Sequence, residues 1–259
     1  MRFCSLGSGS TGNALVVEAA SGATTTRLLV DCGFSLRELD ARLARAGLAA
    51  FSLDAIFVTH EHGDHVGAAV ALARRQRLPL WMSRGTWRAI GCPELEGGLL
   101  RFARDGEAIA AGDIELRPYT VPHDAAEPLQ LCCGDGARTL GVLTDTGAST
   151  AHLLERLQGC DALVLECNHD AALLAQSRYP ASLKARIGGR YGHLANEVSA
   201  QVLGAVRHAG LRHVVAAHLS EENNRPALAA AALAGACGAA PGDIVVAHPQ
   251  RGADWLDLG

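Results

Sequence analysis

The sequence predicts an α+β fold in which two sheets pack face to face with helices on the outside. The chain has 259 residues, of which 49% are hydrophobic, so it can bury a large core. The first and last thirds alternate short apolar runs with amphipathic stretches, whereas residues 101–144 read as consecutive strands separated by turns. This mixture suits two sheets covered by helices. Because no internal repeat and no Pro- or Ser-rich linker divides the chain, we expect one domain spanning residues 1–259.

Six apolar runs rich in Val, Ile and Leu are bounded by turn signals, which is typical of strands. In chain order they are residues 28–31, 55–59, 114–121, 139–145, 162–166 and 213–218. Apolar residues with helical spacing lie between them, and we expect helices at residues 35–46, 66–77, 150–158, 195–209 and 226–237. Ser149 or Thr150 is a suitable N-cap for the third of these helices.

Composition excludes several classes of protein. The net charge of −4 argues against a generally basic surface that coats nucleic acid, while it leaves room for a local basic patch. No run approaches the roughly 18 apolar residues that span a bilayer, and no signal-peptide pattern opens the chain. We therefore expect a cytoplasmic protein without membrane contact. The eight cysteines form no CxxC pair and are expected to stay reduced, with Cys132 and Cys133 on opposite faces of one strand.

Unusual polar residues follow the apolar runs at the point where each predicted strand ends. Asp31, His60, Asp145, Glu166 and His218 all hold such a position. Side chains carried on short loops at strand ends can converge on one point, so we expect one pocket to collect them.

The densest group of candidate ligands is residues 59–65, which read Thr-His-Glu-His-Gly-Asp-His directly after a predicted buried strand. Imidazole suits zinc and its first-row neighbours, and a carboxylate adds a hard, negatively charged donor. Four ligands so close together do not fit one ion comfortably. We therefore expect two adjacent ions, one held by His60 and His62 and the other by Asp64 and His65.

This segment resembles the signature motif of the metallo-β-lactamase superfamily, and the rest of that family's pattern follows in order. The resemblance implies a four-layer αββα sandwich of two mixed sheets with helices outside. It also implies that His123 completes the shell of the first ion, that His218 binds the second, and that Asp145 bridges the two. Asp31 matches the first motif's aspartate, which supports the site from behind the ligands.

Two divalent ions, Zn²⁺ or Mn²⁺, would lower the pKa of a bridging water and polarise a substrate oxygen, so we expect hydrolysis by a metal-bridging hydroxide. His and Asp donors together do not distinguish zinc from manganese. Asp64 with His65, together with a shared Asp145, would make two similar, oxygen-rich metal sites. Such a pair of sites suits a phosphodiester, because the ions can contact it from both sides. A β-lactamase-like site often carries cysteine at the bridging position, and this chain does not.

A second cluster resembles ribonuclease Z, in which a Gly-His pair at the start of a helix precedes the strand that carries the last ligand. By this resemblance Gly192-His193 would place His193 beside the leaving group, as a proton donor or a contact to the phosphate, with Glu166 orienting it. The alternative is that His193 begins a surface helix. Asp64, Glu166 and His193 are the candidate catalytic residues.

Residues 5–13, 192–196 and 219–224 together resemble the pattern of the bacterial YycJ/WalJ-like nucleases. This resemblance implies a DNA exonuclease acting from 5′ ends. The N-terminal Ser/Gly loop offers N–H groups and hydroxyls to a terminal phosphate, and its alternative is a tight strand turn. Residues 178–193 carry four basic and no acidic side chains, which suits either a phosphate backbone or a solvated helix face. The candidate substrate-binding residues are Ser8, Ser10, Asn13, Arg186, Arg190, Ser220 and Asn223.

Two other functions stay open. A small-molecule hydrolase of the same fold would act on a cyclic phosphodiester, a thioester or a lactone, and a metal-binding regulatory protein would have lost catalysis. We favour a nucleic acid substrate, DNA over RNA, with no obligate protein partner. The remaining histidines are expected to be ordinary polar or surface residues: His152, His169, His208, His213 and His248.

Overall fold

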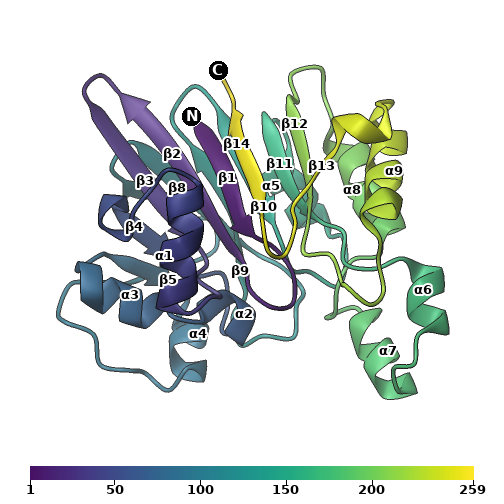
Figure 1. The fold of residues 1–259 in the computed structure, drawn as a ribbon, viewed down its shortest axis with the longest axis horizontal. Helices are drawn as coiled ribbons and strands as arrows, with labels where there is room; N and C mark the ends of the chain where they lie inside the picture. The colour runs from purple at the N-terminus through teal and green to yellow at the C-terminus, as the bar shows by residue number, and fades with distance from the viewer.

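Strands with apolar residues on both faces build two seven-stranded sheets that face each other, with helices on their outer sides (Figure 1). The computed structural model describes residues 1–259. Neighbouring residues of one strand enter different cores: Val17 and Leu28 pack between the sheets, whereas Val16 and Leu29 pack under the outer helices of the first sheet. The predicted sandwich of two mixed sheets is confirmed.

The first sheet has the order β14-β1-β2-β3-β4-β5-β6. Its first four strands pair antiparallel, and β3 to β6 pair parallel. The strands are β1 (Arg2–Gly7), β2 (Ala14–Ser21), β3 (Thr24–Val30), β4 (Ala55–Phe57), β5 (Leu80–Met82), β6 (Leu100–Phe102) and β14 (Ala253–Asp257).

The second sheet has the order β13-β12-β11-β10-β9-β8-β7, with β10 to β13 parallel and β7 to β10 antiparallel. Cys132 and Cys133 of β9 enter different cores, as expected from strand alternation. The strands are β7 (Ile109–Ala111), β8 (Ile114–Thr120), β9 (Leu129–Gly134), β10 (Thr139–Leu143), β11 (Ala162–Glu166), β12 (His213–Ala217) and β13 (Val245–Val246).

Helices cover the outer face of each sheet, and a smaller pair lies apart from them. On the first sheet they are α1 (Leu36–Arg45), η1 (Ala50–Ser52), α2 (Gly63–Val66), α3 (Ala69–Gln76) and α4 (Arg84–Ala89). On the second sheet they are α5 (Ala151–Leu157), α8 (Asn196–Val206), α9 (Pro226–Cys237) and η2 (Pro241–Asp243). The short helices α6 (Ala171–Gln176) and α7 (Ala181–Ile187) extend below the second sheet in Figure 1.

The predicted helices were largely correct. Ser35 and Thr150 cap α1 and α5 by accepting from backbone N–H groups, and α9 has its predicted bounds. The expected helix at residues 66–77 starts later than predicted, because α2 ends at Val66, the chain turns at Gly67, and α3 begins only at Ala69. Gly67 has a φ of 29°, and a Cβ there would collide with the carbonyl oxygen of Cys32. The longest helix has 12 residues, and none combines the length and hydrophobicity needed to cross a bilayer.

The topology brings several strand ends to one edge of the sandwich. Parallel pairing aligns the carboxyl ends of β3 and β4 in the first sheet and of β10, β11 and β12 in the second. Because β8 runs antiparallel to β9 and β9 antiparallel to β10, the end of β8 lies at the same edge. The residues that follow these strands therefore meet where the two sheets face each other.

Candidate metal centre

The seven predicted ligands lie in two neighbouring groups at this edge, with Asp145 between them. One group contains His60, His62 and His123, and the other contains Asp64, His65 and His218. Within each group the ligand atoms lie within 4.8 Å of one another. We refer to them as the three-histidine group and the Asp64 group.

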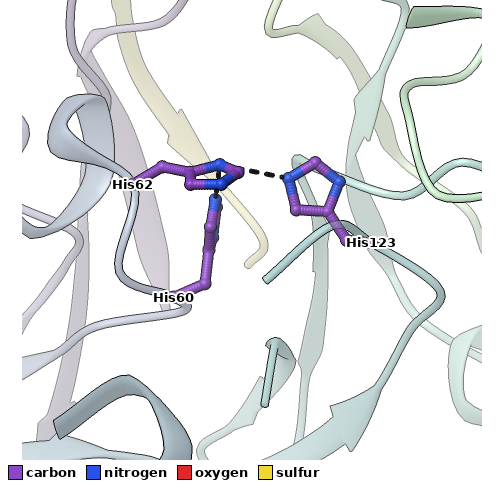
Figure 2. A group of neighbouring side chains, drawn as sticks. All are labelled: His60, His62 and His123. Carbon is purple, nitrogen blue, oxygen red and sulfur yellow. Dashed lines mark hydrogen bonds between the residues drawn. The ribbon is translucent and has the colours of Figure 1, made fainter. Parts of the chain in front are cut away.

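The three-histidine group joins the loop after β4 in the first sheet to the loop after β8 in the second (Figure 2). The Nδ1 atom of His62 lies 3.1 Å from Nε2 of His60 and 3.3 Å from Nε2 of His123. His123 donates from Nδ1 to the carbonyl oxygen of Gly192 at 3.0 Å, which leaves its Nε2 lone pair free to bind a metal. Burial lowers the pKa of His60 and of His123, so both rings are neutral ligands at neutral pH.

The Asp64 group is surrounded by carboxylates. His218 places Nε2 3.3 Å from Oδ2 of Asp64, and His65 donates from Nδ1 to Oδ2 of Asp31 at 2.7 Å. Burial lowers the pKa of His65, but Asp145 and Asp31 more than offset this and raise it well above its usual value. Burial also lowers the pKa of His218, but Asp145 and Asp64 raise it to about 9. The same negative field favours a cation.

Backbone strain is concentrated around this group. Asp31 and His218 are two of only four non-glycine residues with a positive φ, at 61° and 54°. Asp31 also accepts hydrogen bonds from the backbone N–H and the hydroxyl of Thr59, which fixes its carboxylate behind His65. Such strain is typical of functional sites, where the surrounding structure holds it in place.

Asp145 lies between the two groups and is buried. Its Oδ2 is 3.0 Å from Nε2 of His65, and its Oδ1 is 3.2 Å from Nδ1 of His218 and 3.9 Å from Nε2 of His123. Despite these short distances, Oδ2 of Asp145 and Nδ1 of His218 have no aligned hydrogen-bond partner. Buried polar atoms are normally paired, so these unpaired atoms, together with the imidazole and carboxylate donors, fit divalent cations.

His193 lies beside these groups and is oriented by Glu166. Its Nδ1 is 2.7 Å from Oε1 of Glu166, whose other oxygen accepts from the backbone N–H of Thr146. Burial lowers the pKa of His193, but the charge of Glu166 and hydrogen bonds with Asp145 and Glu166 raise it to about 10. The preceding Gly192 packs against the end of α7, where a Cβ would collide with the carbonyl oxygens of Arg186 and Ile187.

A cavity of about 310 Å³ opens onto this site. Its polar wall contains ligands from both groups together with His193, Asp145 and Ser10. Arg186 of α7 also lines it, and donates from Nε to Oδ2 of Asp124 at 2.6 Å. The volume lies at the lower end of the range of small-ligand pockets, about 300–1,000 Å³.

The residues expected to bind substrate divide into accessible and buried sets. Ser10 and Arg186 line the cavity, and Arg190 is exposed next to Tyr191. Ser220 lies instead at a separate cavity of about 730 Å³, formed with residues 245–254. Asn223 is buried.

Ser8 and Asn13 hold positions different from those we expected. Both side chains are buried: Ser8 accepts a hydrogen bond from the backbone N–H of His218, and Asn13 donates to Asp64. Their hydrogen bonds therefore fix the Asp64 group, and the Ser/Gly loop supports the ligands rather than presenting these two side chains to the cavity.

Sequence reasoning missed one carboxylate at the site and misplaced one histidine. Asp124 lies with Oδ1 3.5 Å from Nε2 of His123, and its adjacency to His123 was the available signal. His169, which we expected to be an ordinary polar or surface residue, is buried with Nδ1 unpaired, and its backbone forms a bridge to Ala195.

Comparisons with known proteins show the family of this chain. A family model described as "Beta-lactamase superfamily domain" matches residues 26–219. The chain is 37% identical over 233 residues to Exodeoxyribonuclease YycJ of Bacillus anthracis, covering 88% of this chain and 86% of that protein. It is 32% identical over 234 residues to Exodeoxyribonuclease WalJ of Streptococcus pneumoniae, covering 88% and 85%.

Solved structures share the fold at much lower sequence identity. The metallo-beta-lactamase fold protein YhfI from Bacillus subtilis has a TM-score of 0.74 at 16% identity, covering 98% of each chain. The resemblance seen in residues 59–65 is thus confirmed over most of the chain, and the protein belongs to the metallo-β-lactamase superfamily.

Proposed function

We propose that this protein is an exodeoxyribonuclease that uses two divalent ions, zinc or manganese, to hydrolyse DNA from 5′ ends. The observation that carries the proposal is the position of Asp145, whose carboxylate faces the Asp64 group and also approaches His123 of the three-histidine group. A shared carboxylate between two clusters of ligands is what a two-ion hydrolase requires. The names of the two relatives described above, both exodeoxyribonucleases, support DNA as the substrate.

The three-histidine group would hold one ion, the Asp64 group the other, and Asp145 would contact both. When bound, two such ions supply an activated water and polarise a phosphate oxygen. The protein fixes the ligands for this task through partners behind them: Asp31 orients His65, and the carbonyl oxygen of Gly192 orients His123.

His193 supplies proton transfer at the leaving group. Glu166 occupies its Nδ1, which leaves Nε2 for the substrate, and the ring lines the cavity. The raised pKa of about 10 keeps a proton on the ring at neutral pH, as a general acid requires. Glu166 itself is fully buried and therefore acts by orienting His193 rather than by touching the substrate.

Arg186 and Ser10 are the accessible side chains for phosphate contact, because both line the cavity. Arg186 is 63% exposed and belongs to the stretch that carries basic side chains and no acidic ones. A guanidinium at this rim neutralises charge on the DNA phosphates, even though the protein chain has a net charge of −4. Arg190, exposed four residues later, extends the basic rim.

One observation favours a second candidate function. The cavity of about 310 Å³ suits a small diester as well as one nucleotide at a strand end. A small-molecule hydrolase acting on a cyclic phosphodiester, a thioester or a lactone is therefore the alternative.

The test is to incubate metal-loaded protein with DNA and RNA of one sequence, single- and double-stranded, labelled at either end, beside bis(p-nitrophenyl) phosphate and a simple thioester. We expect the 5′ label to be released first as a mononucleotide while the 3′-labelled strand shortens progressively, with DNA degraded faster than RNA. Thioester cleavage without nucleotide release would contradict the nuclease function, and early release of the 3′ label would reverse the proposed polarity.

A further inference from the structure

Tyr191 is an exposed aromatic residue in the segment that carries Gly192 and His193 into the cavity wall. The large hydrophobic side chains that are exposed in this structure are Phe51, Tyr191 and Leu228, and Tyr191 is 57% exposed. It directly precedes Gly192 and His193, both of which line the cavity. Its carbonyl oxygen accepts a hydrogen bond from the backbone N–H of Asp124 at 2.9 Å, so its backbone is fixed to the loop that carries His123.

The apolar part of the cavity lies on the same side of the site. Leu183 and Ile187 are the two hydrophobic residues that line it, and both belong to α7. The chain returns from α7 through residues 188–190 to Tyr191, and Gly192 packs against the end of the helix. The candidate ligands thus form the polar part of the cavity wall, and Leu183 and Ile187 of α7 form its apolar part. Tyr191 is exposed in the segment that follows α7, directly before the lining residue Gly192.

This division matches the two chemical halves of a nucleotide. The phosphate belongs with the ligand groups and His193, whereas the base has apolar faces that stack on aromatic side chains. Stacking of a base on one aromatic ring changes binding by about 10- to 100-fold and tolerates any base, because every base has a π-face. The guanidinium of Arg190, 5.9 Å from the Tyr191 ring centre, adds a positive charge beside that surface.

We propose that Leu183, Ile187 and Tyr191 form a base subsite that takes the unpaired base of the nucleotide at the strand end. The inference rests on the proposed nuclease function and specifies its substrate. The enzyme would act on a single-stranded or frayed end, and because the apolar side chains of this wall read no base edge, it would degrade all four nucleotides at similar rates.

The test compares Tyr191→Ala and Tyr191→Phe with the native protein on two single-stranded DNAs. One has normal nucleotides at its 5′ end, and the other has abasic residues at the same positions. We expect Tyr191→Ala to lower kcat/KM about 10- to 100-fold on normal DNA and Tyr191→Phe to retain most of it. On abasic DNA the penalty of Tyr191→Ala should disappear. Phe51→Ala, the other exposed aromatic, is the matched control and should leave both rates unchanged.

Two results would overturn the base subsite: equal rates of the native protein and Tyr191→Ala on normal DNA, or an equal loss on normal and abasic DNA. A spectroscopic readout tests stacking directly. Terminal 2-aminopurine should be quenched on binding to His193→Ala protein, and the quenching should be lost when Tyr191→Ala is added. If the native protein degrades neither DNA but hydrolyses the small diester, it is the proposed function that fails.

Discussion

The three-histidine group and the Asp64 group are neighbours, yet their surroundings differ in charge. His60 and His123 are held neutral by burial, whereas carboxylates raise the pKa values of His65 and His218. The three-histidine group therefore offers uncharged nitrogen donors. The Asp64 group combines nitrogen donors with a negative field, and a cation must compete there with protons.

Support from behind the ligands also differs between the two groups. His65 bonds to Asp31, and Asn13 and Ser8 bond to Asp64 and to the backbone of His218. In the three-histidine group, the bonds behind the rings are made by the carbonyl oxygen of Gly192 and the hydroxyl of Thr59. The Asp64 group therefore depends on several side-chain partners that mutation can remove, whereas the three-histidine group combines one backbone carbonyl with one hydroxyl.

The largest expected effect comes from the residue that the two groups share. Asp145→Ala should lower kcat/KM on DNA by at least about 1,000-fold, because it removes a ligand from both ions. Elemental analysis of the purified variant should show that both ions are weakened. Glu115→Gln, which changes an exposed carboxylate at the start of β8, is the control. Loss of only one ion would show that Asp145 belongs to one group alone.

Replacing His193 separates chemistry from ion binding in both groups. His193→Ala should reduce turnover by about 100- to 10,000-fold, the range for a lost general acid, while metal content stays at the native value. The control is His152→Ala, which changes a half-buried histidine of α5 outside the cavity and should change neither quantity. A parallel loss of turnover and metal would mean that His193 is a ligand, since Asp145, Glu166, His193 and His218 lie close enough to hold an ion.

Asp31 tests the dependence of the Asp64 group on side-chain support. Asp31→Asn should weaken the ion of this group about 10- to 100-fold, because the substitution removes the charge that orients His65 and increases its basicity. The affinity of the three-histidine group should fall less, because Asp31 reaches His60 only through the hydroxyl of Thr59. Chelator competition, read as two separate dissociation steps, measures both affinities. Equal weakening at the two groups would contradict their independence.

The smallest effect is a difference in pH dependence. The pKa of His218 is about 9 and that of His65 is also raised, so both rings must lose a proton before they bind an ion. The affinity of the Asp64 group for its ion should therefore rise about tenfold per released proton for each pH unit from 7 to 9. The lowered pKa values of His60 and His123 predict no such rise at the other group. Ion titrations of His62→Ala, which retains the Asp64 group, and of His218→Ala, which retains the three-histidine group, compare the two. A flat profile for His62→Ala would contradict the charge difference.

The convergence of the candidate ligands could be predicted from the sequence because local signals mark these residues. Residues 59–65 are contiguous, and Asp145 and His218 follow apolar runs that are long enough to recognise as strands. The strands β1 and β14 pair across almost the whole chain, so no local pattern identified them as partners.

The role of the N-terminal loop was also beyond local reasoning. Ser8 bonds to a backbone group 210 residues away, and Asn13 to Asp64, 51 residues away. Such contacts depend on how the sheets pack. The break at Gly67 depends likewise on the approach of Cys32 from another loop.

The proposed function requires two ions, one in each group, for phosphodiester cleavage. The direct measurement is to titrate metal-stripped protein with Mn²⁺ or Zn²⁺ while recording bound ions per chain and release of the 5′ label from DNA. We predict that two ions bind and that nucleotide release appears only as the second one binds. Full activity at one ion per chain, or no DNA cleavage with two bound, would contradict the account.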